Sequence, residues 1–182
     1  MHFQAEFYTF DHVIRGLVNT TLDRLCDLLN LKNETTVIVR DAQISRLSGL
    51  GNSEPNTLTT AKLEKSSILF AYPAEMDMST NSIFRRVTRQ VFPVLVILPN
   101  FEISGQIHLT EKFDIHRVLL SRTEDFIPLT NSTVVYSTHP NVIVTRSTIV
   151  FNKNYLVLIG ERQITDDLLT PSRKDDTYKD SH

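Results

Sequence analysis

The residues best placed for binding chemistry lie in one short segment near the N-terminus. Asp27 and Asn30 form a polar pair that a short helix could present to a partner, with the Arg24 guanidinium beside them. A local, structural role is the interpretation that these residues favour, because Asn30 can end a helix in left-handed geometry and Asp27 can bond to Arg24 or to nearby backbone. We name Arg24, Asp27 and Asn30 as candidate interaction residues.

A basic cluster offers a second kind of chemistry. Arg85, Arg86 and Arg89 lie close together, with Phe84 and Phe92 nearby. Guanidinium groups contact phosphate and aromatic rings stack on bases, so this cluster is typical of a single-stranded nucleic-acid surface. It is also typical of a solvated helix face that forms salt bridges with neighbouring carboxylates.

The sequence predicts no catalytic residue, no metal site and no cofactor. Nucleophilic catalysis needs a Ser or Cys beside a base, and the chain has no G-x-S-x-G segment. Cys26 is the lone cysteine, and the six histidines lack an HExxH motif. The close glycine pair Gly49 and Gly51 lacks the Lys-Ser/Thr that a phosphate loop requires. We therefore expect a protein that is not an enzyme.

Composition limits the partners and the cellular compartment that we expect for the protein. Hydrophobic residues make up 41% and charged residues 22% of 182 residues, and the net charge is −2, so no long-range attraction to nucleic acid or to an anionic membrane is expected. A lone thiol fits a reducing compartment, and no segment resembles a secretory signal or a membrane span. These features predict a cytoplasmic protein without a membrane partner.

The elements that must position these residues occur twice. Four blocks of the first half align, in the same order, with four blocks of the second half, which predicts a tandem repeat. The aligned pairs are 7–16 with 96–105, 22–30 with 113–121, 36–44 with 127–135, and 68–73 with 155–160.

Each repeat predicts a small ββαββ module with room for one more strand. The first block predicts a hairpin whose returning strand holds Gly16 or Gly105, where a glycine marks a bulge or a close backbone approach. The second block predicts a short helix with Thr21 or Thr110 as N-cap. The remaining blocks predict β-branched strands, the last with a turn at 64–67 or 152–154. We expect an α+β, β-rich fold, either a small barrel or a sheet with one helix packed on it, with the two modules related by a pseudo-two-fold axis.

Domain boundaries follow from the repeat. Residues 1–73 form the first module, 74–90 a linker that can be helical, 91–162 the second module, and 163–182 a flexible polar tail. The Ser-, Gly- and Asn-rich segment 46–57 is a loop of the first copy.

The helix-to-strand passage resembles a known family. The segment from Arg24 to Asn30 resembles the R-x-S-D-x-L-N segment of a family of short, uncharacterised bacterial domains of unknown function, in which F-x-x-L-T-x-A-x-V follows. The first copy has Cys26 at the Ser position and Thr35 at the Phe position. The second copy keeps the strand that begins at Phe126 but loses the helix signature. The resemblance implies a fold and no activity.

These observations favour a non-enzymatic protein-interaction or assembly module, with a protein partner or self-association. Two alternatives stay open. One is a small barrel that binds single-stranded nucleic acid through Arg85, Arg86 and Arg89. The other is a sensor domain with a small ligand between the modules.

Overall fold

Ten strands account for most of the described chain. The computed structural model describes residues 2–49, 54–74, 90–109, 114 and 123–162, the side chains of 139–142 excepted. The N-terminal half contains β1 (His2–Tyr8), β2 (His12–Asn19), α1 (Leu25–Leu29), β3 (Thr36–Arg46), the 3-10 turn η1 (Leu47–Gly49), β4 (Asn56–Glu64), the 3-10 turn η2 (Lys65–Ser67) and β5 (Phe70–Pro73). The C-terminal half contains β6 (Gln90–Leu98), β7 (Phe101–Leu109), β8 (Phe126–Tyr136), β9 (His139–Asn152), the 3-10 turn η3 (Lys153–Tyr155) and β10 (Leu158–Glu161).

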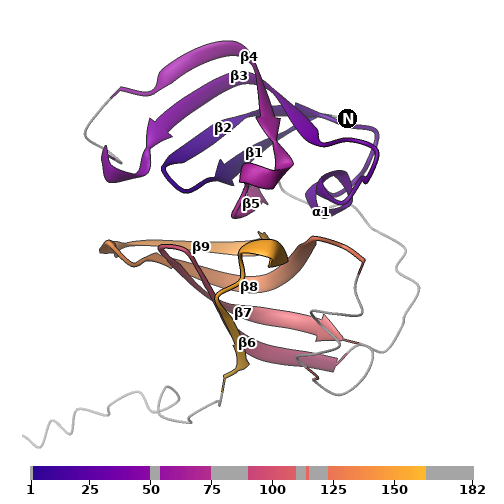
Figure 1. Cartoon of the computed structure of the whole chain (residues 1–182), viewed down its shortest axis with the longest axis vertical. Helices are drawn as coiled ribbons and strands as arrows, with labels where there is room; N and C mark the ends of the chain where they lie inside the picture. The colour runs from indigo at the N-terminus through magenta and orange to yellow at the C-terminus, as the bar shows by residue number, and fades with distance from the viewer. Residues whose placement is uncertain (1, 50–53, 75–89, 110–113, 115–122, 163–182) are drawn as a thin grey trace, which may run out of the picture.

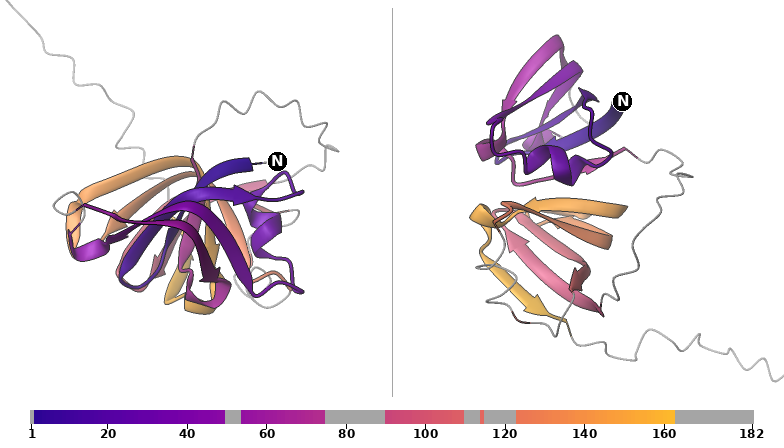
Figure 2. Two further views of the ribbon diagram at one scale, coloured as in Figure 1. Left: turned by 90° about the horizontal axis from the view of Figure 1, so that it is seen from above. Right: turned by 90° about the vertical axis from the view of Figure 1, so that its right-hand side faces the viewer.

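All ten strands belong to one antiparallel sheet. Their order is β10-β6-β7-β8-β9-β5-β1-β2-β3-β4. The sheet curls twice, so that each half forms a lobe, and β5 and α1 of the N-terminal half lie against β8 and β9 of the C-terminal half (Figures 1 and 2).

The expected α+β fold of ββαββ modules is wrong, because the described residues are nearly all strand. The α-helix begins after the N-cap Arg24, not after Thr21, and it spans five residues. A 3-10 turn divides the last segment of each half into two strands. The turn follows Glu64 in the first half and Asn152 in the second, and the strand after it pairs with the first strand of that half. Apart from Asp114, the helix expected at 113–120 lies outside the described residues.

The two halves nevertheless repeat one topology. In each, four strands form a meander and the fifth returns to pair with the first, giving β5-β1-β2-β3-β4 and β10-β6-β7-β8-β9. Backbone hydrogen bonds repeat as well. The bond from the Leu69 N–H to the Tyr8 carbonyl oxygen (2.8 Å) corresponds to that from Val157 to Ile97 (2.9 Å). The bond from Ala74 to Gln4 (2.7 Å) corresponds to that from Arg162 to Pro93 (2.8 Å), and the bond from Lys65 to Thr35 corresponds to that from Lys153 to Asp125 (both 2.8 Å).

A β-bulge repeats at the centre of each half. The register shifts at Gly16 between β2 and β3, and at Gly105 between β7 and β8. A Cβ on Gly16 would lie 2.6 Å from the Arg40 carbonyl oxygen, so the close approach of the strands requires glycine there. Opposite the bulges, Asp41 and Asn131 both adopt a φ of 48°, which Asp and Asn tolerate better than most residues.

The expected pseudo-two-fold arrangement is also wrong. A two-fold contact joins equivalent surfaces. Here β5 pairs with β9, whose equivalent in the N-terminal half is β4, not β5. The two halves are therefore joined head to tail, because the two strands that meet occupy different places in the repeat.

Strand alternation buries both faces of the sheet near this contact. Phe7 and Ala71 point into the core of the N-terminal half, whereas Tyr8, Phe70 and Tyr72 point to the opposite face and join the core of the C-terminal half. All five side chains are buried. The two lobes thus share a continuous apolar contact.

The segments predicted as linker and tail lie outside the described residues, apart from Ala74 and Gln90 at the ends of the former. No helix of the described chain has the length and apolar character needed to cross a membrane.

Candidate assembly site

The junction between the two halves begins with a short strand pair. Phe70 lies opposite Phe151 and Ala71 opposite Val150. Asn152, which is buried, extends the pairing: its backbone N–H donates to the Leu69 carbonyl oxygen over 2.9 Å, and its Nδ2 donates to the Ile68 carbonyl oxygen over 3.0 Å. Strand β9 thus supplies hydrogen-bond partners to the backbone at the start of β5 and to the two residues before it.

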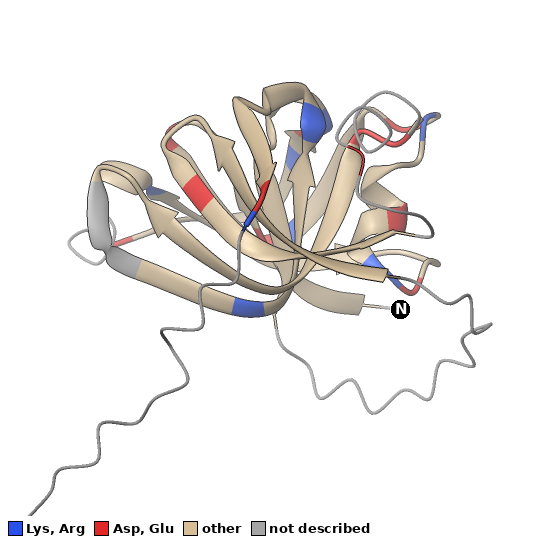
Figure 3. Cartoon of the chain, turned by 90° about the horizontal axis from the view of Figure 1, so that it is seen from below, with Lys and Arg blue, Asp and Glu red and all other residues tan. Residues whose placement is uncertain are grey.

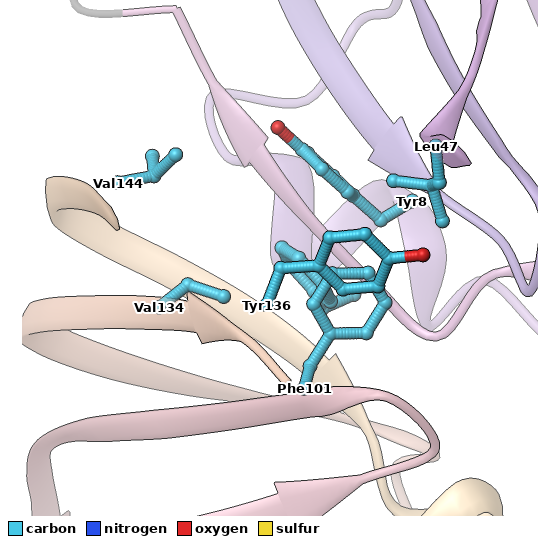
Figure 4. A pocket seen from close by; sticks show the side chains of 7 residues that line it. Tyr8, Leu47, Phe101, Val134, Tyr136 and Val144 are labelled. Carbon is cyan, nitrogen blue, oxygen red and sulfur yellow. The ribbon is translucent and has the colours of Figure 1, made fainter. Parts of the chain in front are cut away.

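An aromatic cluster fills the space between the lobes. Tyr8 stacks on Phe70 with ring centroids 4.3 Å apart, and Phe101 stacks on Tyr136 at 5.1 Å. Phe70 meets Phe101 edge to face at 4.9 Å, which joins the two pairs across the junction. Figure 4 shows Tyr8 and Leu47 of the N-terminal half facing Phe101 and Tyr136 of the C-terminal half.

The hollow left inside this cluster is small and apolar. Its volume is about 20 Å³. Pockets for small ligands usually measure about 300–1,000 Å³, whereas about 10–15 Å³ holds one water molecule. The space between the lobes is therefore filled by side chains rather than left for a metabolite. Its lining residues are Tyr8, Leu47, Phe70, Phe101, Val134, Tyr136 and Val144.

A polar network borders the aromatic cluster. The Tyr72 hydroxyl donates to the Glu6 carboxylate over 2.8 Å and lies 2.9 Å from the Tyr8 hydroxyl, while Arg15 forms an ion pair with Glu6 at 2.9 Å. The Arg146 guanidinium lies 4.6 Å from the centre of the Tyr72 ring, which adds a cation–π contact across the junction. Burial is the main cause that raises the pKa of both tyrosines, so their hydroxyls stay protonated as donors.

The helix α1 supplies a second link between the halves. Asn30, the C-cap residue, has a φ of −87° and not left-handed geometry. Its Nδ2 donates to the Phe126 carbonyl oxygen over 2.8 Å, and its Oδ1 accepts from the backbone N–H groups of Phe126 (2.9 Å) and Asp125 (3.1 Å). Lys32 adds an ion pair with Asp125 at 2.8 Å, which lowers the pKa of that carboxyl group.

A buried lysine fixes the end of this helix. The Lys65 ammonium donates to the Leu28 carbonyl oxygen over 2.8 Å and to the Leu31 carbonyl oxygen over 3.1 Å. It thereby adds a charged donor for two carbonyl groups at the helix end, of which that of Leu28 also accepts the Leu31 N–H over 3.3 Å. Burial lowers the pKa of Lys65, because removal from water disfavours its charge.

The remaining candidate residues divide into two groups. Arg24 is the N-cap and Asp27 lies in the first turn of α1, on the same short element as Asn30. Arg85, Arg86 and Arg89 lie outside the described residues. Figure 3 shows acidic and basic residues interspersed over the described strands and turns, without a continuous run of one sign.

The two end strands of the sheet form the other notable surface. Along the described chain, β4 pairs only with β3, and β10 only with β6. Leu58 on β4 is 46% exposed, and Leu158 on β10 is 47% exposed. An open hollow lies beside β10, lined by Leu95, Glu102, Ser104, Leu158, Gly160, Glu161 and Arg162.

The described residues contain no cluster of three or more His, Cys, Asp or Glu side chains that could hold a metal ion. Cys26 lies at the junction, where its Sγ donates to the Phe126 carbonyl oxygen over 3.5 Å.

Sequence reasoning missed the aromatic cluster. The sequence carried two signals: the aromatic residues Phe70 and Tyr72 on either side of Ala71, and the adjacent pair Phe7-Tyr8. Neighbouring residues of a strand point to opposite faces, so Phe7 and Tyr8 place one aromatic ring on each face. Aromatic residues on both faces indicate a strand that is covered on both sides.

Comparison with known proteins found no relative of this chain. No protein-family model matches the chain, and neither a curated protein nor a solved structure matches it. The resemblance of Arg24–Asn30 to the family of short bacterial domains therefore stays a prediction.

Proposed function

We propose that this chain is a non-enzymatic assembly module of the cytoplasm that holds protein strands at the edges of its sheet. The observation that carries the proposal is the junction between β5 and β9. There, an edge of one five-stranded unit is extended by an edge of another, and an aromatic contact seals the pair. Strand addition of this kind is a common mode of protein recognition, in which main-chain hydrogen bonds provide much of the affinity.

The small hollow between the lobes supports this proposal over the small-ligand sensor. A ligand between the halves would have to displace the stacked rings of Phe101 and Tyr136, which contact one another and the rings of the N-terminal half. The loss of these contacts would oppose binding there.

The net charge of −2 and the interspersed acidic and basic residues along the ribbon in Figure 3 favour a protein partner over nucleic acid. The cluster of Arg85, Arg86 and Arg89 remains the one feature that favours nucleic acid, and the experiment must therefore test it directly.

The test is the solution mass of the full chain, measured by size exclusion with light scattering. The measurement is made with and without total RNA or DNA, at low and at high salt. We expect an assembly larger than one chain whose mass does not change with nucleic acid. A single chain under all conditions would contradict the proposal. So would a mass that rises with nucleic acid and falls back at high salt, since that salt dependence indicates phosphate contacts.

A further inference from the structure

The junction inside the chain is a head-to-tail contact, and its two partners each have a counterpart at an end of the sheet. The junction joins β5 of one unit to β9, the fourth strand of the other unit. The counterpart of β5 is β10, and the counterpart of β9 is β4. These two are the end strands of the described sheet. The chain thus presents the same two complementary edges that it already joins internally.

We propose that β10 of one chain pairs with β4 of a second copy of this chain, in the way that β5 pairs with β9. The register follows from the repeat. Phe70 opposite Phe151 becomes Leu158 opposite Leu63 of the second chain, and Ala71 opposite Val150 becomes Ile159 opposite Lys62. This inference rests on the proposed assembly function and names the partner as the chain itself.

The surface beside β10 fits an apolar side chain from the second copy. At the junction, Arg146 of β9 covers the Tyr72 ring of β5. The counterpart of Arg146 is Leu58 of β4, and the counterpart of Tyr72 is Gly160. No atom lies within 4 Å of a Cβ built on Gly160, so the space that the tyrosine fills in the first unit is open in the second. The exposed Leu58 of the second copy fits the hollow beside Gly160, between Leu95 and Leu158.

Acidic residues outnumber basic ones around this hollow, because Glu102 and Glu161 line it together with one cation, Arg162. Phe101 and Tyr136, which stack at the junction, have His12 and Arg46 as their counterparts. Glu102 lines the hollow beside β10. Docking places this carboxylate near the imidazole and guanidinium groups of the second chain, which fixes orientation more than it adds affinity.

A head-to-tail contact repeats from chain to chain. Each chain uses β10 to contact one neighbour and β4 to contact another, so the assembly closes into a ring or grows as a filament. The same pairing also covers backbone groups of edge strands that would otherwise be exposed to unwanted pairing.

Cross-linking between two tagged variants of the full chain tests the register. Both carry Cys26→Ala, one carries Leu158→Cys and the other Leu63→Cys, and they are mixed and oxidised. Residues that lie opposite one another on paired strands have the Cα separation that a disulfide needs. We expect a mixed disulfide dimer from this pair. The matched control replaces Leu158→Cys by Ile143→Cys, a position that is 60% exposed and lies on neither end strand, and it should give far less product.

An association measurement tests the same contact without cysteine chemistry. Leu58→Asp should raise the dissociation constant of the assembly about tenfold or more, because it places a carboxylate in the apolar part of the hollow. Ile143→Asp is the matched control and should leave the constant unchanged. Thermal unfolding of each variant reports whether the fold is intact.

The outcomes separate this inference from the proposed function. An assembly that forms no cross-link and is indifferent to Leu58→Asp would overturn the inference while leaving an assembly module. A chain that stays monomeric would overturn both. Binding of nucleic acid by an assembly that does cross-link between positions 158 and 63 would overturn only the proposed function.

Discussion

The junction inside the chain and the two end strands of the sheet share a backbone arrangement but differ in their side chains. At the junction, Tyr8, Phe70 and Tyr72 of strands β1 and β5 lie on the face that meets Phe101 of β7. All four side chains are buried. At the end strands, the counterparts of these four residues are Ile97, Leu158, Gly160 and His12. The same topology thus supports a buried apolar contact at the junction and a partly exposed surface at the end strands.

This difference agrees with what each contact must do. The junction joins parts of one chain, so it is present at all protein concentrations and can be extensive and apolar. A contact between end strands must offset the loss of translational and rotational freedom of a second chain. Its smaller side chains therefore favour a reversible association that depends on protein concentration.

The largest expected effect separates the two regions directly. Phe101→Ala should lower the free energy of unfolding by about 3–5 kcal/mol, because a buried ring that contacts Tyr8, Phe70 and Tyr136 is lost. The matched variant is His12→Ala at the equivalent position, for which we expect a change within about 0.5 kcal/mol. Urea unfolding of both variants measures the difference. Equal losses would contradict the contrast between junction and end strands.

A smaller effect tests the link that α1 adds at the junction. Asn30→Ala should lower the free energy of unfolding by about 1–3 kcal/mol, because the buried backbone N–H of Phe126 loses its acceptor and the Phe126 carbonyl oxygen keeps only the weak Cys26 Sγ donor. Asn33→Ala, at an exposed position three residues later, is the control. Amide hydrogen exchange at Phe126 should accelerate in the first variant only. Unchanged exchange there would mean that the helix does not hold the junction.

The smallest effect concerns pH. Lys32 holds the pKa of Asp125 below its ordinary value of about 4, so the ion pair stabilises the fold fully above that pH. The contribution is lost as pH falls through the lower folded pKa. Both side chains are partly exposed, so the effect should stay below about 1 kcal/mol. Asp125→Asn should flatten this part of the stability profile, whereas Glu124→Gln, at the exposed neighbour, should not. A profile that Asp125→Asn leaves unchanged would rule out the pair.

Local features of the fold were accessible from the sequence. The hairpins that contain Gly16 and Gly105, the β-branched strands and the turns after Glu64 and near Asn152 all appear where their residues indicate. Turn chemistry and strand alternation act over a few residues, so a single sequence displays them. Asn30 was also identified as a candidate, although its partner was not.

Register illustrates where local information ends. The alignment of the two copies placed Ile44 over Val135. The structure pairs Ile44 with Ile14 and Val134 with Ile103, so Val134 is the true equivalent. A slip of one residue exchanges the two faces of a strand. The alignment could not detect it, because both neighbours at that point are valines.

By itself, the sequence determined the repeated elements, the positions of the bulges and the alternation that gives each strand an inner and an outer face. The tertiary structure alone decided that the last strand of each half returns to pair with the first, that β5 pairs with β9, and that Asn30 meets Phe126. These contacts join residues far apart in the chain, and their stability comes from apolar burial and backbone hydrogen bonds across the junction. Such a choice of partner depends on the shapes of two assembled surfaces, which no periodicity within one strand describes.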